Sequence, residues 1–249
     1  MAQQNYFSVM VVGDNPDELL KPYSKDLIVD DYIVYKADEA KKLQENEITV
    51  LSKLLELKTL SEKQESYIQD KLDLIKEFNP TEYFNFLTDG MKLDEDGNAI
   101  SNINPNGKFD FAKKGRRFSL PLKLYDGSET WQAHSREIDF EGMHLTNYRT
   151  YEVVWEMFKE GREPKTEEEK TLYDNMKTMN NYFDSFKSKE DYVVYNTAFF
   201  HYAYLDGKQG WIDMDDVKDS HKWVAEFYDR FVMPLNPDDL VTIYECRLV

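Results

Sequence analysis

Cysteine is nearly absent from this chain of 249 residues, and its scarcity narrows the class of protein. The single Cys246 excludes an internal disulfide, a thiolate-rich zinc site and the small secreted scaffolds that depend on several bridges. Long apolar runs are also missing, because none approaches the ~18 residues that a membrane span needs. The first residues lack the basic region and apolar core of a signal peptide. We therefore expect a soluble cytoplasmic protein with no membrane partner.

Basic residues are scarce relative to acidic ones. The sequence has 31 Lys and Arg against 48 Asp and Glu, which gives a formal net charge of −17. This balance argues against direct binding to nucleic acid, whose phosphates repel an acidic protein. Hydrophobic residues make up 41% of the chain and aromatic residues 14%, enough for a packed core. The composition therefore predicts a globular protein whose partner is another protein.

The two ends of the chain both have the pattern of strands. Residues 6–12 are nearly all apolar and rich in β-branched side chains, as expected of an inner strand that is covered on both faces. Pro16 fits the first turn of a short helix that ends near Leu20. Residues 240–246 form a second apolar run. With no repeat or low-complexity linker, we expect one α+β domain over 1–249, whose mainly antiparallel sheet contains the N- and C-terminal strands.

Two insertions are expected between these strands. Apolar residues recur at three- and four-residue steps in 37–58, and a Ser61–Gln64 capping box opens a second helix, so 36–78 predicts a helical hairpin. Residues 94–138 are rich in turns and predict a β-hairpin insertion. In it, 118–124 should pair with 130–134 across an Asp-Gly turn.

The second half alternates between helix and hairpin. Aromatic residues on one stripe predict a helix over 148–158, and Thr166 followed by three glutamates predicts the start of another. Residues 198–204 and 211–214 should form a hairpin. A last helix is expected over 220–233.

The clearest local anomaly is a basic stretch between Asn104 and Tyr125, whose charge is +5. Glycine amid cations lets backbone amides turn toward one point, and guanidinium groups can bind a phosphate or carboxylate through two hydrogen bonds. This pattern indicates an anion site, and the alternative is a solvated turn whose cations pair with nearby acids. The candidate anion-binding residues are Lys108, Lys113, Lys114, Gly115, Arg116 and Arg117.

Acidic residues are concentrated between Asp206 and Asp239, where nine acids face four bases. Such a surface can imitate a phosphate backbone or dock on a basic partner, and the alternative is a solubilising surface. The candidate partner-binding residues are Asp213, Asp215, Asp216 and Asp219.

No pattern of catalytic or metal-ligating residues stands out. The sequence contains neither a GxSxG elbow nor a phosphate-binding GxxxxGK[ST] loop. His134, Asp139, Glu141 and His144 could converge, but their spacing matches no helical ligand pair. We expect His201 to be a hydrogen-bonded structural histidine on a strand, and Cys246 to behave as a small apolar residue. The sequence therefore predicts no metal site and no cofactor, and it favours a non-enzymatic protein without identifying any enzyme class.

Three segments resemble a family of phage-encoded and prophage-encoded proteins. They are Tyr6 to Tyr23, Asn104–Phe111, and the end from Phe227–Phe231 through Leu240–Cys246. The family pattern has an opening strand with an NPE-type turn and a PY pair, a central NPxxKWDW…GGRW segment and a closing LPDDTLLT strand that ends in Asp-Cys. Here Phe109 and Phe111 replace the two tryptophans of KWDW. Residues 115–118 read Gly-Arg-Arg-Phe instead of GGRW, and Glu245 precedes the terminal cysteine.

The resemblance implies a context rather than a mechanism, namely a phage accessory protein in the cytoplasm of a bacterial host. Our first hypothesis is a non-enzymatic binding protein that engages a host or phage macromolecule and blocks a defence or nucleic-acid-processing system, for example as an anti-CRISPR protein. The alternative is a protein that binds or cleaves an anionic, nucleotide-type small molecule with the basic loop at 113–117. A third hypothesis is a structural component of the virion.

Overall fold

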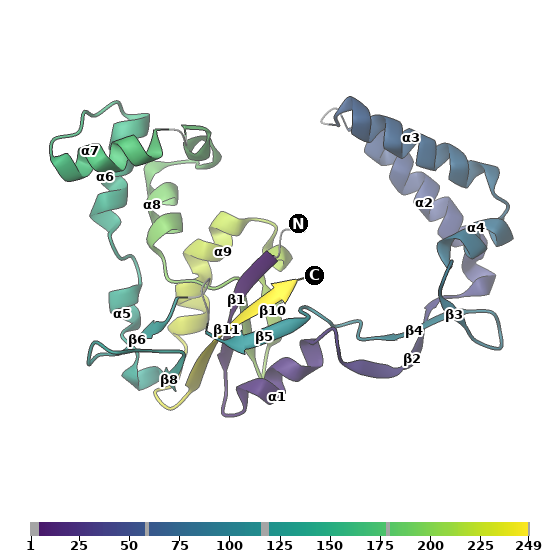
Figure 1. Ribbon diagram of the computed structural model, residues 1–249, viewed down its shortest axis with the longest axis horizontal. Helices are drawn as coiled ribbons and strands as arrows, with labels where there is room; N and C mark the ends of the chain where they lie inside the picture. The colour runs from purple at the N-terminus through teal and green to yellow at the C-terminus, as the bar shows by residue number, and fades with distance from the viewer. Residues whose placement is uncertain (1–4, 58–59, 116–119, 178–179, 249) are drawn as a thin grey trace. The chain divides into compact units, whose positions relative to one another are not determined.

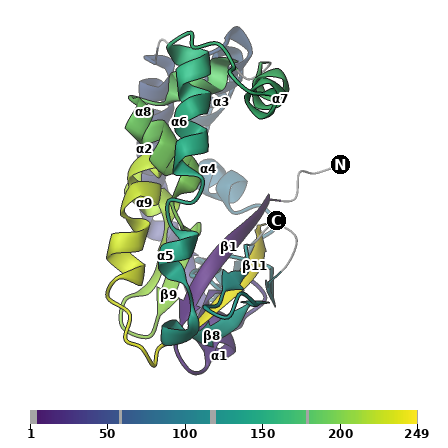
Figure 2. The same cartoon turned by 90° about the vertical axis from the view of Figure 1, so that its left-hand side faces the viewer.

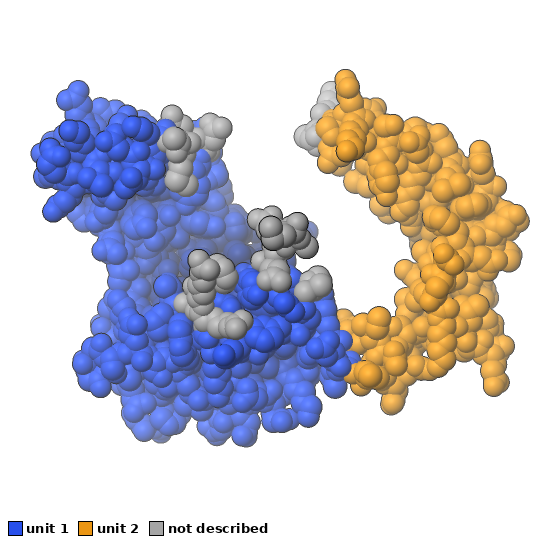
Figure 3. Space-filling view, in the orientation of Figure 1, with its two compact units in different colours: residues 1–27, 106–249 blue, residues 28–105 orange. Residues whose placement is uncertain are grey.

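A computed structural model describes residues 5–57, 60–115, 120–177 and 180–248. The chain divides into two compact units (Figure 3): unit 1 comprises residues 1–27 and 106–249, and unit 2 comprises residues 28–105. The fold class is α+β, as predicted. The assignment of the whole chain to one domain stays a prediction. Of the helices in the described ranges, none has the length and apolar character needed to cross a bilayer.

Unit 1 is built on a mainly antiparallel sheet in which the two ends of the chain meet (Figure 1). β1 (Asn5–Val12) pairs with β11 (Leu240–Leu248) in antiparallel register along its whole length. This pairing confirms the prediction that the N- and C-terminal strands share a sheet. The strand order is β10-β9-β1-β11-β5, β8 also pairs with β11, and β9 runs parallel to β1. The further strands are β5 (Phe111–Lys114), β8 (Gln132–His134), β9 (Ala203–Asp206) and β10 (Gly210–Asp213).

Both faces of this sheet carry an apolar core, because successive residues of a strand point to opposite faces. Met10 belongs to a core that includes Trp223 of α9, and Val9 belongs to a second core that includes Leu20 of α1. Figures 1 and 2 show α9 and α1 on opposite sides of β1 and β11. The elements beside the sheet are α1 (Pro16–Leu20), a 3-10 turn (Lys21–Tyr23), α5 (Phe140–Met143), α9 (Ser220–Phe227) and a π-helical turn (Tyr228–Val232).

A third core of unit 1 lies among helices of the second half. Trp155 of α6, Phe183 and Tyr192 of α8 are buried together, and their rings are 5.2 to 6.4 Å apart. Of these helices, the sequence predicted α6 and α7 but not α8. The helices are α6 (Tyr148–Lys159), α7 (Glu167–Met176) and α8 (Lys189–Thr197), with a 3-10 turn at Asn180–Ser185.

Unit 2 contains the predicted helical hairpin. The Ser61–Gln64 capping box is present. The main core of unit 2 consists of Leu51, Leu72, Ile75 and Tyr83. The unit extends beyond the predicted 36–78 at both ends, and it includes a helix beginning at Pro80 that the sequence patterns did not predict. Its elements are β2 (Ile28–Tyr35), a 3-10 turn (Ala37–Glu39), α2 (Ala40–Leu55), α3 (Glu62–Glu77), α4 (Pro80–Leu87), β3 (Lys92–Leu93) and β4 (Ala99–Ile103).

The segment predicted as a β-hairpin insertion over 94–138 is divided between the two units at residue 106. A short hairpin of β6 (Leu122–Lys123) and β7 (Glu129–Thr130) does form across the Asp126-Gly127 turn. β8, however, pairs with β11 instead of extending this hairpin, because Ala133 is buried in the core beside Val241. Residues 118 and 119 of the expected strand lie outside the described residues.

Candidate functional site

One cavity of about 280 Å³ in unit 1 brings residues from both candidate charge clusters together. It combines three aromatic side chains, three carboxylates and two lysines. We call it the acid–aromatic cavity. Its lining residues are Phe7, Lys25, Gly107, Lys108, Tyr202, Trp211, Asp213, Asp215, Asp216 and Leu248.

Trp211 is the centre of the aromatic wall. The centroid of its ring lies 6.3 Å from that of Phe7 and 5.3 Å from that of Tyr23, and Phe7 in turn lies 4.9 Å from Tyr202. Phe7, Tyr202 and Trp211 are only partly buried, at the margin of the core that faces α1. Residues that pair across neighbouring strands share a face of the sheet. Trp211 of β10 pairs with Leu205 of β9, and Leu205 pairs with Val11 of β1. Phe7 lies on the same face of β1 as Val11, so Trp211 and Phe7 come together. The sequence reading did not single out these rings.

Asp213 is a buried structural carboxylate. Its Oδ2 atom accepts hydrogen bonds from Lys108 Nζ at 3.1 Å and from Trp211 Nε1 at 2.8 Å. Its Oδ1 atom accepts one from the backbone N–H of Asp216 at 3.3 Å and so caps the turn over 214–217. Because the side chain is only 6% exposed, Asp213 shapes the cavity instead of projecting from it.

Asp215 and Asp216 are the exposed carboxylates of the cavity. The Tyr202 hydroxyl donates to Asp215 Oδ2 at 2.6 Å, and the backbone N–H of Asp213 donates to Asp216 Oδ2 at 3.1 Å. Burial, followed by the hydrogen bond to Asp215, raises the pKa of Tyr202. Tyr202 therefore stays protonated at neutral pH and holds the Asp215 carboxylate in place.

Asp219, the fourth candidate acid, does not line this cavity. It is the N-cap of α9, where its Oδ1 atom accepts from the backbone N–H groups of His221 and Lys222 at 3.1 and 3.2 Å. The pKa of Asp219 is held below its usual value, most strongly by the hydrogen bond from the Lys222 backbone N–H. The nearby Lys187 ammonium and the hydrogen bond from the His221 backbone N–H lower this pKa further. Helix capping accounts for this acid.

The described members of the basic stretch do not converge on one point. Lys108 is ion-paired with Asp213 in the acid–aromatic cavity. Lys113 and Lys114 are successive residues of β5, so their side chains point to opposite faces of the sheet. Lys114 Nζ lies 3.3 Å from Gln132 Oε1 and 3.8 Å from a carboxylate oxygen of Asp17.

Gly115 is explained by packing. Its φ of +49° is in the left-handed region, and a Cβ atom at this position would overlap the Trp131 ring. Its backbone N–H donates to the Ile243 carbonyl at 3.0 Å, so that amide is already used by the sheet. Arg116 and Arg117 lie outside the described residues.

The histidines considered as metal ligands have separate local partners. His134 Nδ1 is 3.0 Å from the Asp238 carbonyl, and Asp139 caps α5 through the Gly142 amide at 2.9 Å. His144 Nδ1 accepts from the Phe199 backbone N–H at 3.2 Å, and its ring stacks on Tyr228. Within the described ranges, no group of three or more His, Cys, Asp or Glu residues could hold a metal ion.

Cys246 is fully buried in β11, and burial raises the pKa of its thiol. The thiol is therefore protonated at neutral pH and packs as an apolar group.

Comparisons with protein-family models, curated proteins and solved structures give no match for this chain. The functional argument therefore depends on the geometry of the site alone.

Proposed function

We propose that this protein is a non-enzymatic binding protein that engages a basic protein surface through the acid–aromatic cavity. The observation that carries the proposal is the meeting of three aromatic rings and two exposed carboxylates at one cavity. An arginine or lysine side chain fits this chemistry, because its aliphatic stem packs on aromatic rings while its cationic end pairs with carboxylates. The guanidinium group of arginine adds the planar, two-pronged hydrogen bonding that carboxylates favour.

The charge of the whole chain supports the same class of partner. A net charge of −17 attracts basic proteins over long range and repels nucleic acid. Asp213 is neutralised locally by Lys108, so the exposed Asp215 and Asp216 are the carboxylates left to meet a cation. We infer that the partner contributes an arginine-rich or lysine-rich surface.

The resemblance to phage-encoded proteins gives this proposal a setting. We propose that the basic partner is a host or phage protein of a defence or nucleic-acid-processing system, since proteins that act on nucleic acids carry basic surfaces. An acidic protein that covers such a surface would block access of the nucleic acid. This mode of action needs no catalytic residue.

The test compares two charge-matched double variants. In Asp215→Asn with Asp216→Asn, asparagine keeps the shape and an acceptor oxygen at each position. In Glu95→Gln with Asp96→Asn, the control, two adjacent exposed acids of a turn in unit 2 lose the same charge. We expect the first variant to bind a labelled oligo-arginine peptide roughly tenfold more weakly, at up to about 1 kcal/mol for each carboxylate. Fluorescence anisotropy at low and physiological ionic strength would measure both affinities.

Equal affinities of the two double variants would overturn the proposal, because binding would then follow net charge and not the cavity. The two double variants can also be used to capture proteins from a bacterial lysate. The natural partner is a protein that the control variant retains and the cavity variant does not.

The alternative of an anionic small-molecule site gains no support from the described part of the basic stretch, where Lys108 and Lys114 face acids. A thermal-shift screen with nucleotides separates the two functions. A ligand at a hundred times its dissociation constant stabilises a protein by about 2.7 kcal/mol. A stabilising nucleotide whose effect disappears in Arg116→Ala with Arg117→Ala would favour the alternative.

A further inference from the structure

The helical hairpin of unit 2 leaves large apolar side chains in contact with solvent on both of its helices. Single exposed apolar residues are common, but a contiguous patch of them marks an interaction surface. Five such side chains, between 36 and 69% exposed, form what we call the hairpin face. They are Val50 and Leu54 of α2, Leu57 just after it, and Tyr67 and Leu74 of α3.

The exposed side chains of the two helices lie on the same side of the hairpin. In each helix they recur at steps of three, four or seven residues, so they form one stripe along it. The same spacing places Glu47 on the stripe of α2 and Lys71 on the stripe of α3. These two residues form an ion pair with an N–O distance of 2.7 Å. Because the ion pair joins the two stripes, they form one continuous face.

The hairpin face is distinct from the seam that holds α2 and α3 together. The seam includes Leu51, Leu72 and Ile75, which are at most 7% exposed. A helix that packs on one neighbour needs only a narrow apolar stripe, whereas a helix in a bundle has a wider one because it contacts several neighbours. The second stripe on each helix therefore indicates that further helices pack on this hairpin.

α4 covers one end of the same side. The Tyr83 hydroxyl of α4 donates to Glu47 Oε2 at 3.3 Å, and the ring of Phe86 lies 5.3 Å from that of Phe78, which follows α3. Figure 1 shows α4 beside the end of the hairpin that is nearer to β3. Phe86 is itself 46% exposed and extends the hairpin face. The element that covers this side of the hairpin is thus a helix, and its cover is incomplete.

The hairpin face is locally neutral, although the chain carries a net charge of −17. Its stripes contain one acid, Glu47, which is paired with Lys71. With a rotation of about 100° per residue, Glu45, Glu56 and Glu62 lie more than a third of a turn away from the stripes. A neutral face does not attract a basic partner, but an identical face can approach it without bringing like charges together.

We propose that the hairpin face binds the same face of a second copy of this chain, so that two hairpins form a four-helix bundle. In a symmetric dimer both copies present the same patch, so the two surfaces match in width and length. The two helices of one copy then cover the stripes of the other, as in bundles of antiparallel helices. The hairpin face shares no residue with the acid–aromatic cavity, so the two proposals can fail independently.

The size of the hairpin face predicts a weak dimer. Six partly exposed side chains for each copy, Phe86 included, offer less area than the roughly 800 Å² for each partner of a standard interface. We therefore expect a dissociation constant on the order of 10 to 100 µM. Added salt screens the repulsion between two chains of charge −17 and should strengthen the dimer, whereas it weakens peptide binding at the acid–aromatic cavity.

The test introduces like charges into the hairpin face. Val50→Glu with Tyr67→Glu changes its two most exposed residues, and we expect the dissociation constant of the dimer to rise at least about tenfold. The control, Thr49→Glu with Gln69→Glu, adds the same charge at exposed positions outside both stripes and should leave the dissociation constant nearly unchanged. Sedimentation equilibrium of the full chain measures all three dissociation constants.

A mixing experiment guards against a folding defect in the first variant. Val50→Lys with Tyr67→Lys should also be monomeric alone. An equimolar mixture of the Lys and Glu variants should form heterodimers, because opposite charges then meet across the interface.

Three results would each overturn the proposal. The first is an unaltered protein that stays monomeric at about ten times the expected dissociation constant, which would mean that another part of the chain or a different protein covers the hairpin face. The second is a control variant that dimerises as weakly as the Glu variant. The third is a mixture of the Lys and Glu variants that is no more dimeric than either variant alone.

Discussion

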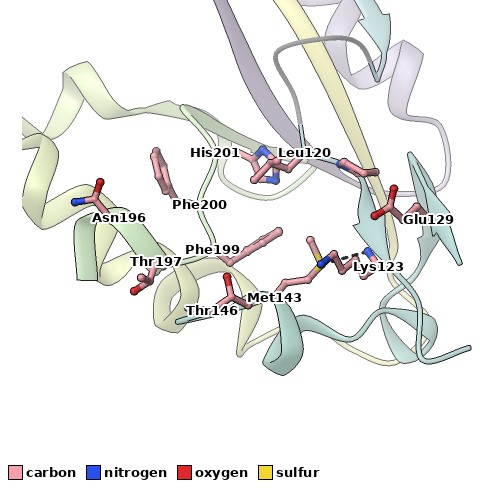
Figure 4. Close-up of a pocket in the computed structure, with 12 residues that line it drawn as sticks. Leu120, Lys123, Glu129, Met143, Thr146, Asn196, Thr197, Phe199, Phe200 and His201 are labelled. Atoms are coloured by element: carbon pink, nitrogen blue, oxygen red, sulfur yellow. Dashed lines mark hydrogen bonds between the residues drawn. The ribbon is translucent and has the colours of Figure 1, made fainter. Parts of the chain in front are cut away.

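Two of the cavities of unit 1 have nearly equal volumes, about 280 and 290 Å³, but opposite chemistry. The acid–aromatic cavity is lined by charged groups, and its buried carboxylate on Asp213 receives three hydrogen bonds. The second cavity, whose wall includes Met143, Phe199 and His201 (Figure 4), is lined mainly by apolar groups, and the buried Nε2 atom of His201 receives no hydrogen bond from the described residues. The fold itself satisfies the central carboxylate of the acid–aromatic cavity and leaves Asp215 and Asp216 exposed, whereas the Nε2 atom of His201 is left without a partner where solvent does not reach it.

This difference shows that the density of charge in a sequence does not tell which charged groups the fold uses for its own hydrogen bonds. Of the four acids singled out, Asp213, Asp216 and Asp219 accept hydrogen bonds from backbone N–H groups at or near the starts of helical turns. Among the described residues, Asp215 alone of the four has no backbone donor of this kind, and its carboxylate accepts a hydrogen bond from the Tyr202 hydroxyl instead.

The largest expected effect concerns acid stability and His201. Its pKa is lowered from 6.5 to about 3 in the folded protein, so the unfolded chain binds more protons between these values. The free energy of unfolding therefore falls as the pH drops below 6.5, by roughly 3 kcal/mol near pH 4. His201→Phe has no group that titrates at this position. Between neutral pH and pH 4 we therefore expect its free energy of unfolding to fall by roughly 3 kcal/mol less than that of the unaltered protein. Urea unfolding at neutral pH and near pH 4 measures the difference, and equal losses would contradict the prediction.

The next largest effect concerns the buried carboxylate of the other cavity. Asp213→Ala removes the acceptor for Lys108, Trp211 and the Asp216 amide, and we expect it to lower the free energy of unfolding by about 2 to 3 kcal/mol. The matched control Asp215→Ala, at an exposed position, should change it by less than about 0.5 kcal/mol. Chemical unfolding of both variants would measure the contrast. A cost at Asp213 as small as that at Asp215 would show that Asp213 is not structural.

The smallest effect is expected at Tyr202. Tyr202→Phe removes one hydrogen bond to the exposed Asp215 and should destabilise the protein by less than about 0.5 kcal/mol. The aromatic wall remains, so the variant should retain most of its affinity for the oligo-arginine peptide. Thermal unfolding measures the change in stability, and fluorescence anisotropy measures the affinity for the peptide. Loss of affinity as large as that of the Asp215 and Asp216 double variant would mean that the hydroxyl itself contacts the partner.

Much of the fold could be predicted from local patterns. The apolar run of β1, the Ser61–Gln64 capping box and the aromatic stripe of α6 each depend on neighbours within a few residues, and each prediction is confirmed. By contrast, α8 was missed because its apolar residues do not form a clear stripe; Tyr192 and Val193 are adjacent and both buried. The pairing of β8 with β11 was missed because it joins residues more than a hundred positions apart.

The candidate sites were less predictable than the fold. The basic stretch predicted an anion site, yet the structure pairs Lys108 with Asp213 and places Gly115 beneath Trp131. Trp211 and Asp213 lie two residues apart on one strand, and that spacing was the available signal for a shared face. The link to Phe7 required the strand order of the sheet, because residue 7 reaches this face only through the pairing of β1 with β9.

By itself, the sequence determined the α+β class, the union of the first and last strands and the starts of several helices, because periodicity and capping act over short stretches of chain. Only the tertiary structure decided which charges are paired and which buried polar atoms lack a partner among the described residues. The pairing of Lys108 with Asp213 and the burial of His201 both depend on the packing of segments that are distant in sequence. Local patterns cannot reveal such long-range neighbours, and these neighbours set the chemistry of both cavities.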